Sequence, residues 1–204
     1  MTLPYITEKT VRFIVIGDSL SAGKGDSKFK GWVNRVFSRS DLSGFPAVEI
    51  LYLTYPNSSF SQILDSIDTD LERLIGDSEI YENKIVFSNG FIDVLADQIS
   101  YSKINFGIFV DKLSNFSDYV LIIGPPATTS AASAESNAKI INDNIKDICS
   151  RRKLPFIDLI DPLKNNSQWK ESLNKNEGEF PNRTGYQVLS YAILQPIWQD
   201  WINQ

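Results

Sequence analysis

Histidine is absent from this 204-residue sequence. Of all side chains its ordinary pKa lies closest to neutrality, which makes it the usual base for taking the proton of a serine hydroxyl. A serine–histidine catalytic pair is therefore excluded for these residues. Any serine that acts as a nucleophile here needs a different side chain as its base.

The sequence also lacks long apolar runs and an excess of positive charge, and it contains one cysteine. The single cysteine, Cys149, leaves neither an internal disulfide nor a cysteine-bound zinc ion. No apolar stretch approaches the roughly 20 residues of a membrane span, and residues 1–10 lack the basic and apolar regions of a secretory signal. The net charge is −5 and the lysines and arginines form no stripe, so we expect no nucleic-acid partner. These absences predict a cytoplasmic protein.

Strands and helices alternate along the chain. Expected strands, short and apolar, cover 13–16, 48–53, 84–88, 119–123 and 154–159. Expected helices, with apolar residues three and four apart, cover 31–37, 59–75, 106–116, a segment around 140–148, 163–173 and 185–201. Repeated strand–helix units predict an α/β fold, in which a five-stranded parallel sheet lies between two layers of helices. Length and composition favour a single domain over residues 1–204.

The first expected strand ends in Gly17-Asp18-Ser19-Leu20, followed by small residues and two further glycines. Glycine permits a sharp turn at the carboxyl end of the strand, and in open parallel sheets ligands bind at that edge. Ser19 is thus a candidate nucleophile. It is equally a candidate helix N-cap, because serine is one of the preferred residues at that position.

Three blocks of the sequence resemble the SGNH (GDSL) hydrolases, a flavodoxin-like group of esterases and acylhydrolases. The blocks are 17–20 after the first strand, 89–93 after the third, and the late loop 177–182 that runs into Gly185-Tyr186. Their order, their spacing and their positions at strand ends agree with the family over nearly the whole length. The resemblance implies a three-layer flavodoxin-like fold with a five-stranded parallel sheet.

In that family the first block supplies the serine nucleophile. A turn after the second strand and an asparagine complete the oxyanion hole. A late Asp-x-x-His-Pro motif supplies the orienting acid (Asp) and the general base (His). Laid onto this sequence, the resemblance places Ser19 at the nucleophile and, through its backbone N–H, in the oxyanion hole. It places Asn57 at the turn, where a second backbone N–H still donates. Ile92 stands in place of the asparagine, Glu177 in place of the acid and Phe180 in place of the base. The side chains of Ile92 and Phe180 have no group that can carry out those roles.

These changes predict that ordinary ester hydrolysis is lost. Loss of the base in a serine hydrolase costs on the order of 10⁶ in turnover, and loss of one oxyanion donor costs about 10² to 10³. Further residues are expected to line the cleft that holds the substrate in the hydrolase family, or simply to fill it: Asp18, Tyr55, Gly90, Phe91 and Asp93. Ile92 and Phe180 make this cleft more apolar than in a working hydrolase.

Three substitutes for the missing base are open. Glu177 serves if burial against Phe180 raises its pKa. Lys24 serves if it folds over the site, although its simpler role is that of a solvated loop residue. Asp18, Asp93 and Glu177 together suit a hard cation such as Mg²⁺. The simpler interpretation is that the two aspartates hold their turns through backbone hydrogen bonds, and we expect no metal or other cofactor.

The sequence is consistent with two functions. The first is a catalytically degenerate SGNH-like protein that binds a small-molecule or acyl-bearing ligand, or a protein partner, through the old cleft. The second is an active enzyme of the same family that acts on an ester or acyl substrate with rebuilt chemistry, using Ser19 and nearby carboxylates. A basic group within about 3.2 Å of the Ser19 oxygen favours the enzyme.

Overall fold

The sheet has five parallel strands in the order β2-β1-β3-β4-β5. The computed structural model describes residues 8–204 except for 29, 91–92, 95–98, 129–131 and 176–179. The strands are β1 (Thr10–Gly17), β2 (Val48–Thr54), β3 (Tyr81–Ser88), β4 (Tyr119–Ile123) and β5 (Phe156–Ile157). This order is the flavodoxin-like one, in which the chain reverses direction across the sheet between β1 and β3. The parallel five-stranded sheet predicted from the sequence is confirmed.

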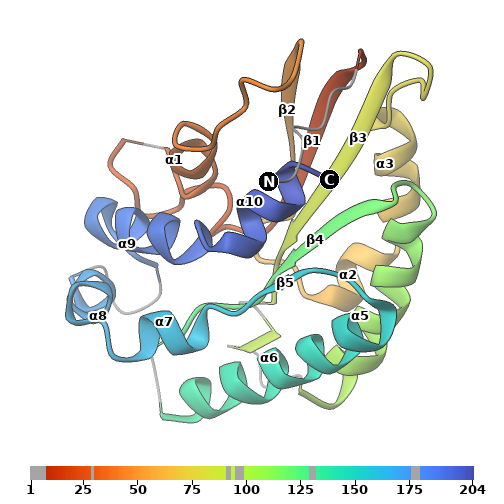
Figure 1. Ribbon diagram of the computed structural model, residues 1–204. Helices are drawn as coiled ribbons and strands as arrows, with labels where there is room; N and C mark the ends of the chain where they lie inside the picture. The colour runs from red at the N-terminus through yellow and green to blue at the C-terminus, as the bar shows by residue number, and fades with distance from the viewer. Residues whose placement is uncertain (1–7, 29, 91–92, 95–98, 129–131, 176–179) are drawn as a thin grey trace.

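Helices cover both faces of the sheet (Figure 1). Alternate side chains of β1 point to opposite faces, so that Phe13 and Val15 belong to one core cluster while Ile14 and Ile16 belong to the other. The first face carries α1 (Val33–Phe37), α7 (Ile160–Lys164), α8 (Ser167–Asn174), α9 (Arg183–Ile193) and α10 (Pro196–Ile202). The second carries α2 (Phe60–Leu64), α3 (Ile67–Leu74), α5 (Ile99–Ser114) and α6 (Ala132–Arg152).

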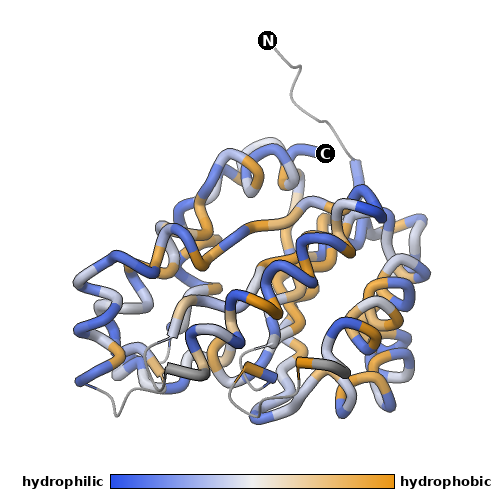
Figure 2. The backbone as a smooth tube through the Cα atoms, turned by 90° about the horizontal axis from the view of Figure 1, so that it is seen from below, coloured by the Kyte–Doolittle hydropathy of each residue, from blue (hydrophilic) through white to orange (hydrophobic). Residues whose placement is uncertain are grey.

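Hydrophobic residues follow the strands and the inner sides of the helices (Figure 2). On the first face the aromatic rings of α10 anchor the end of the chain to the sheet. The Trp201 ring lies 5.9 Å from that of Phe13, and the Trp198 ring lies 5.4 Å from that of Phe37, centroid to centroid. Each large ring buries about 150 to 250 Å², so these contacts supply much of this core. Within the described residues, no helix is long and apolar enough to cross a membrane.

Several predicted elements have different bounds. The helix expected over 59–75 divides into α2 and α3, and the helix expected over 185–201 divides into α9 and α10. The second break precedes Pro196, because a residue before proline is driven from helical to extended backbone, and Gln195 has ψ 165°. The helix expected over 163–173 is also two helices, α7 and α8, with Asn166 capping the second. The expected strand over 154–159 shortens to the two residues of β5.

Candidate functional site

Ser19 lies two residues beyond β1, at the carboxyl edge of the sheet where the strand order reverses. The turn begins at Gly17, where a Cβ atom would lie 2.1 Å from Ser21 Oγ and 2.8 Å from the Ser88 carbonyl oxygen. Glycine is needed here because the neighbouring strand approaches so closely. The residues after Ser19 form hydrogen-bonded turns and no helix, so its proposed role as a helix N-cap is wrong.

The hydroxyl of Ser19 is held by Asn57. It donates to the Asn57 side-chain oxygen at 3.3 Å, and the Asn57 backbone N–H donates to the hydroxyl oxygen, also at 3.3 Å. Asn57 has φ 58°, in the left-handed region that asparagine tolerates better than most residues. Its backbone N–H was expected at this point, but its side-chain oxygen was not. Ser19 is 3 % exposed, and within the described part of the chain these are its hydroxyl's hydrogen bonds.

The two buried aspartates near Ser19 each accept a hydrogen bond from a backbone N–H. Asp18 accepts a hydrogen bond from the backbone N–H of Leu20 at 2.9 Å, and Asp93 accepts one from that of Phe60 at 3.1 Å. Asp18 thus holds its own turn, the simpler role considered for it from the sequence, whereas Asp93 binds the start of α2. No group of three histidine, cysteine or acidic residues placed to hold a metal occurs among the residues described.

Phe180 packs against the loop that contains Ser19. The Lys24 ammonium lies 4.4 Å from the centre of the Phe180 ring, and the Lys24 backbone N–H donates to the Ser19 carbonyl oxygen. Tyr186, at the start of α9, donates from its hydroxyl to the Lys24 carbonyl oxygen at 2.7 Å. Lys24 thus directs its charge at an aromatic face, a favourable cation–π arrangement.

Comparison with known proteins supports the fold through structure alone. No family model matches the chain, and no curated protein matches it. A lipase/acylhydrolase from Enterococcus faecalis matches with a TM-score of 0.71 at 20 % identity, covering 93 % of this chain and 96 % of that one. A member of the lipolytic G-D-S-L family from Veillonella parvula matches with a TM-score of 0.68 at 16 % identity, covering 90 % and 96 %. The chain has the SGNH (GDSL) hydrolase fold.

An acetylxylan esterase from Geobacillus stearothermophilus extends the comparison, with a TM-score of 0.70 at 12 % identity over 98 % of both chains. Two catalytic mutants of that esterase, one with a serine and the other with a histidine changed to alanine, match to a similar degree. On this SGNH fold, the present chain keeps a serine after β1 but has no histidine.

Three residues singled out from the sequence, Phe91, Ile92 and Glu177, lie outside the described residues. Of the others on this SGNH fold, Gly90 has φ +110°, and a Cβ there would lie 3.1 Å from the Phe60 ring. Glycine therefore suits both the backbone and the space at the end of β3.

Tyr55, predicted to line the cleft, packs against the second-face core and donates from its hydroxyl to Asp70 of α3 at 2.7 Å. The side chain thus reaches toward α3.

Asn89 opens the block 89–93 and is a polar residue of this site whose side chain had no predicted role. It follows Ser88, which pairs with Gly17, and it is 3 % exposed. Its side-chain oxygen accepts from the Gly90 N–H at 2.5 Å, while its Nδ2 has no hydrogen-bond partner among the described residues. A buried donor without a partner is costly, about 1 to 3 kcal/mol. The sequence signal that could have pointed to this side chain is an asparagine between a buried strand and a glycine.

Burial raises the pKa of Asp93 to about 6, and the negative charge of Asp18 acts in the same direction against the hydrogen bond from Phe60. Asp93 is 1 % exposed, so its surroundings favour the uncharged acid. Between pH 3.8, the ordinary pKa of the group, and about pH 6, the folded state therefore holds a proton that the unfolded chain has released. Stability must fall as the pH rises through that window and level off above it.

We therefore expect Asp93→Asn to be more stable than the parent above pH 7, by about 3 kcal/mol from the pKa difference. The amide oxygen can still accept from Phe60, and the cost of a buried charge is gone. Urea unfolding at pH 4, 5, 6 and 7.5 measures the effect, with the exposed Asp200→Asn as control. Parallel pH profiles for the parent and Asp93→Asn would show that the group does not titrate as described.

Proposed function

We propose that this protein is a catalytically degenerate SGNH-fold protein that does not hydrolyse esters by a serine–histidine mechanism. It binds a small-molecule or acyl-bearing ligand at the carboxyl edge of the sheet, beside Ser19. The observation that carries the proposal is the pairing of the Ser19 hydroxyl with Asn57, through the side-chain oxygen and the backbone N–H.

This pairing gives Ser19 no means of activation. An amide oxygen accepts a hydrogen bond but does not take up a proton near neutral pH, so it cannot serve as a general base. The Asn57 N–H, which would have to stabilise an oxyanion, donates instead to the Ser19 oxygen itself. The sequence supplies no histidine to replace either interaction.

Two features support ligand binding at the same edge. In open α/β sheets a ligand binds where the strand order reverses, and Ser19 follows β1 at that point. Asn89 follows the neighbouring strand β3, and its Nδ2, which has no hydrogen-bond partner in the part of the chain that the structure describes, is a donor that a carbonyl or ester oxygen would satisfy. The structural relatives named as esterases and acylhydrolases make an acyl group the first chemistry to test.

The purified protein is expected to cleave p-nitrophenyl acetate and butyrate no faster than buffer, because among the described residues no base contacts the Ser19 hydroxyl and the Asn57 N–H already donates to it. The assay is run on the parent chain and on Ser19→Ala, both confirmed folded by circular dichroism. Addition of octanoate should give saturable shifts of amide NMR signals near Ser19 and Asn89, and Asn89→Leu should weaken them.

Turnover above buffer that disappears in Ser19→Ala would instead establish the alternative, an enzyme with rebuilt chemistry that uses Ser19 and nearby carboxylates. Absence of both turnover and saturable shifts would overturn the ligand-binding half of the proposal for acyl groups.

A further inference from the structure

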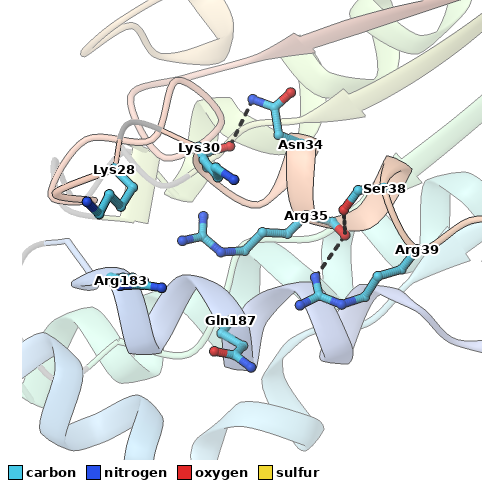
Figure 3. A pocket seen from close by; sticks show the side chains of 8 residues that line it. All are labelled: Lys28, Lys30, Asn34, Arg35, Ser38, Arg39, Arg183 and Gln187. Atoms are coloured by element: carbon cyan, nitrogen blue, oxygen red, sulfur yellow. Dashed lines mark hydrogen bonds between the residues drawn. The ribbon is translucent and has the colours of Figure 1, made fainter.

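A cavity lies on the first face of the protein, between the loop after β1, helix α1 and helix α9 (Figure 3). Its volume is about 700 Å³. Five of its eight lining side chains are cationic and the other three are polar and uncharged, and none of the lining residues described is acidic. They are Lys28, Lys30, Asn34, Arg35, Ser38, Arg39, Arg183 and Gln187.

The positive charge in this basic pocket is out of proportion to the rest of the chain. The protein has a net charge of −5, yet five of its 20 lysines and arginines are gathered here. Within the described residues, Lys28, Lys30, Arg39 and Arg183 form no ion pair with a carboxylate. Like charges held close together repel, and a bound anion removes that cost.

Arg35 gives the basic pocket a fixed centre. It is 8 % exposed, and its Nη1 donates to Asp26 at 2.6 Å and also to the carbonyl oxygen of Gly31. Its Nε and Nη2 have no partner among the described residues. In Figure 3 the guanidinium extends across the pocket between Lys30 and Arg183.

The loop that carries the two lysines is held by the same carboxylate. Asp26 accepts from the backbone N–H groups of Lys28, Lys30 and Gly31 at 3.0 to 3.2 Å, in addition to the bond from Arg35. One buried acid thus fixes both the loop and the arginine. The backbone of the two lysines and the Arg35 guanidinium are therefore positioned before any ligand arrives, which is an arrangement that favours binding.

We propose that the basic pocket binds a phosphorylated sugar or polyol. Its volume lies within the usual range for a small-molecule site, about 300 to 1,000 Å³. Arginine guanidinium groups match phosphate oxygens in pairs. Asn34, Ser38 and Gln187 offer hydrogen bonds to hydroxyl groups, and among the described residues that line the pocket none is aromatic or aliphatic. This proposal is independent of the ligand proposed beside Ser19.

Isothermal titration of the full chain with fructose 1,6-bisphosphate tests the proposal, at constant ionic strength and beside inorganic phosphate and fructose. We expect saturable binding of the bisphosphate, weaker binding of phosphate, and none of fructose. The exposed double variant Lys30→Gln with Arg183→Gln should weaken binding at least tenfold. A matched control removes one lysine and one arginine from the second face, Lys146→Gln with Arg73→Gln, and should leave binding unchanged.

Vesicles that contain phosphatidylinositol phosphate form a second arm, because the same phosphate chemistry occurs on lipid headgroups. Flotation with these vesicles, lost in the pocket variant, together with no binding of the soluble bisphosphate, would assign the phosphate to a lipid and overturn the soluble ligand. Equal loss of binding in the pocket and control variants would reduce the effect to net charge and overturn the site. Absence of saturable binding to both the soluble bisphosphate and the vesicles would also overturn the site.

Discussion

The triple variant Phe180→His, Glu177→Asp, Ile92→Asn is expected to hydrolyse p-nitrophenyl butyrate in a Ser19-dependent manner. The histidine would supply the base, the aspartate would orient it, and the asparagine would restore an oxyanion donor. We expect a gain of about 10³ or more over the parent chain, because loss of the base alone costs on the order of 10⁶. The asparagine is expected to contribute about 3 kcal/mol of transition-state stabilisation.

The three changes act as a unit, so each single variant should gain little. Asn57 must also release the Ser19 hydroxyl, which it holds at 3.3 Å through bonds long enough to be weak. Hydrolysis by the single, double and triple variants is compared with that of the triple variant carrying Ser19→Ala. A folded triple variant without Ser19-dependent activity would mean that the site differs from a hydrolase at further positions.

Replacing Asp26 with alanine is expected to destabilise the protein by about 3 to 5 kcal/mol, since it leaves a buried arginine without its partner. The Asp26 side chain is fully buried and accepts four hydrogen bonds. Its burial alone raises the pKa, but the hydrogen bonds and charge of Arg35 and the backbone donors together lower the pKa below its ordinary value. The stability that the ionised Asp26 contributes is present at pH values above its ordinary pKa and is lost as the pH falls below it.

Urea unfolding at pH 7 measures the loss, and Asp26→Asn should be intermediate because an amide oxygen still accepts from the loop. The matched control is Asp41→Ala, which also removes an aspartate that accepts from a backbone N–H two residues on, but at an exposed site. If Asp26→Ala and Asp41→Ala unfold at the same urea concentration, the Asp26–Arg35 pair does not organise this loop.

The sheet could be predicted because each strand is a short apolar run with a clear end, as in β4, whose predicted bounds match. The broken helix over 59–75 could not. Ile63 of α2 and Ile67 and Leu71 of α3 are all buried and four residues apart, so the apolar spacing continues across a break in the backbone. Periodicity reports which side chains face the core and is insensitive to one non-helical turn.

At the site, the end of the first strand predicted the position of Ser19 because a strand end is a local signal, whereas the Asn57 backbone N–H was placed by the resemblance to the hydrolase family. The side-chain bond between them joins residues 38 positions apart and depends on the left-handed backbone of Asn57. The basic pocket could not be predicted from the sequence for the same reason. Its cations come from 28–39 and 183–187, so the sequence shows no stripe even though the fold collects them.

The distribution of helices between the two faces has a consequence for the order of folding. The second face is built from one continuous stretch, α2 to α6, whereas the first combines α1 with α7 to α10. Its bonds span the chain, as between Arg39 and Ser190 or Trp198 and Ser40. Contacts between residues so far apart form late because closing long loops costs entropy. During synthesis, the part of α1 that packs against α9 and α10 therefore stays uncovered until those helices have left the ribosome, and chaperones have their longest access there.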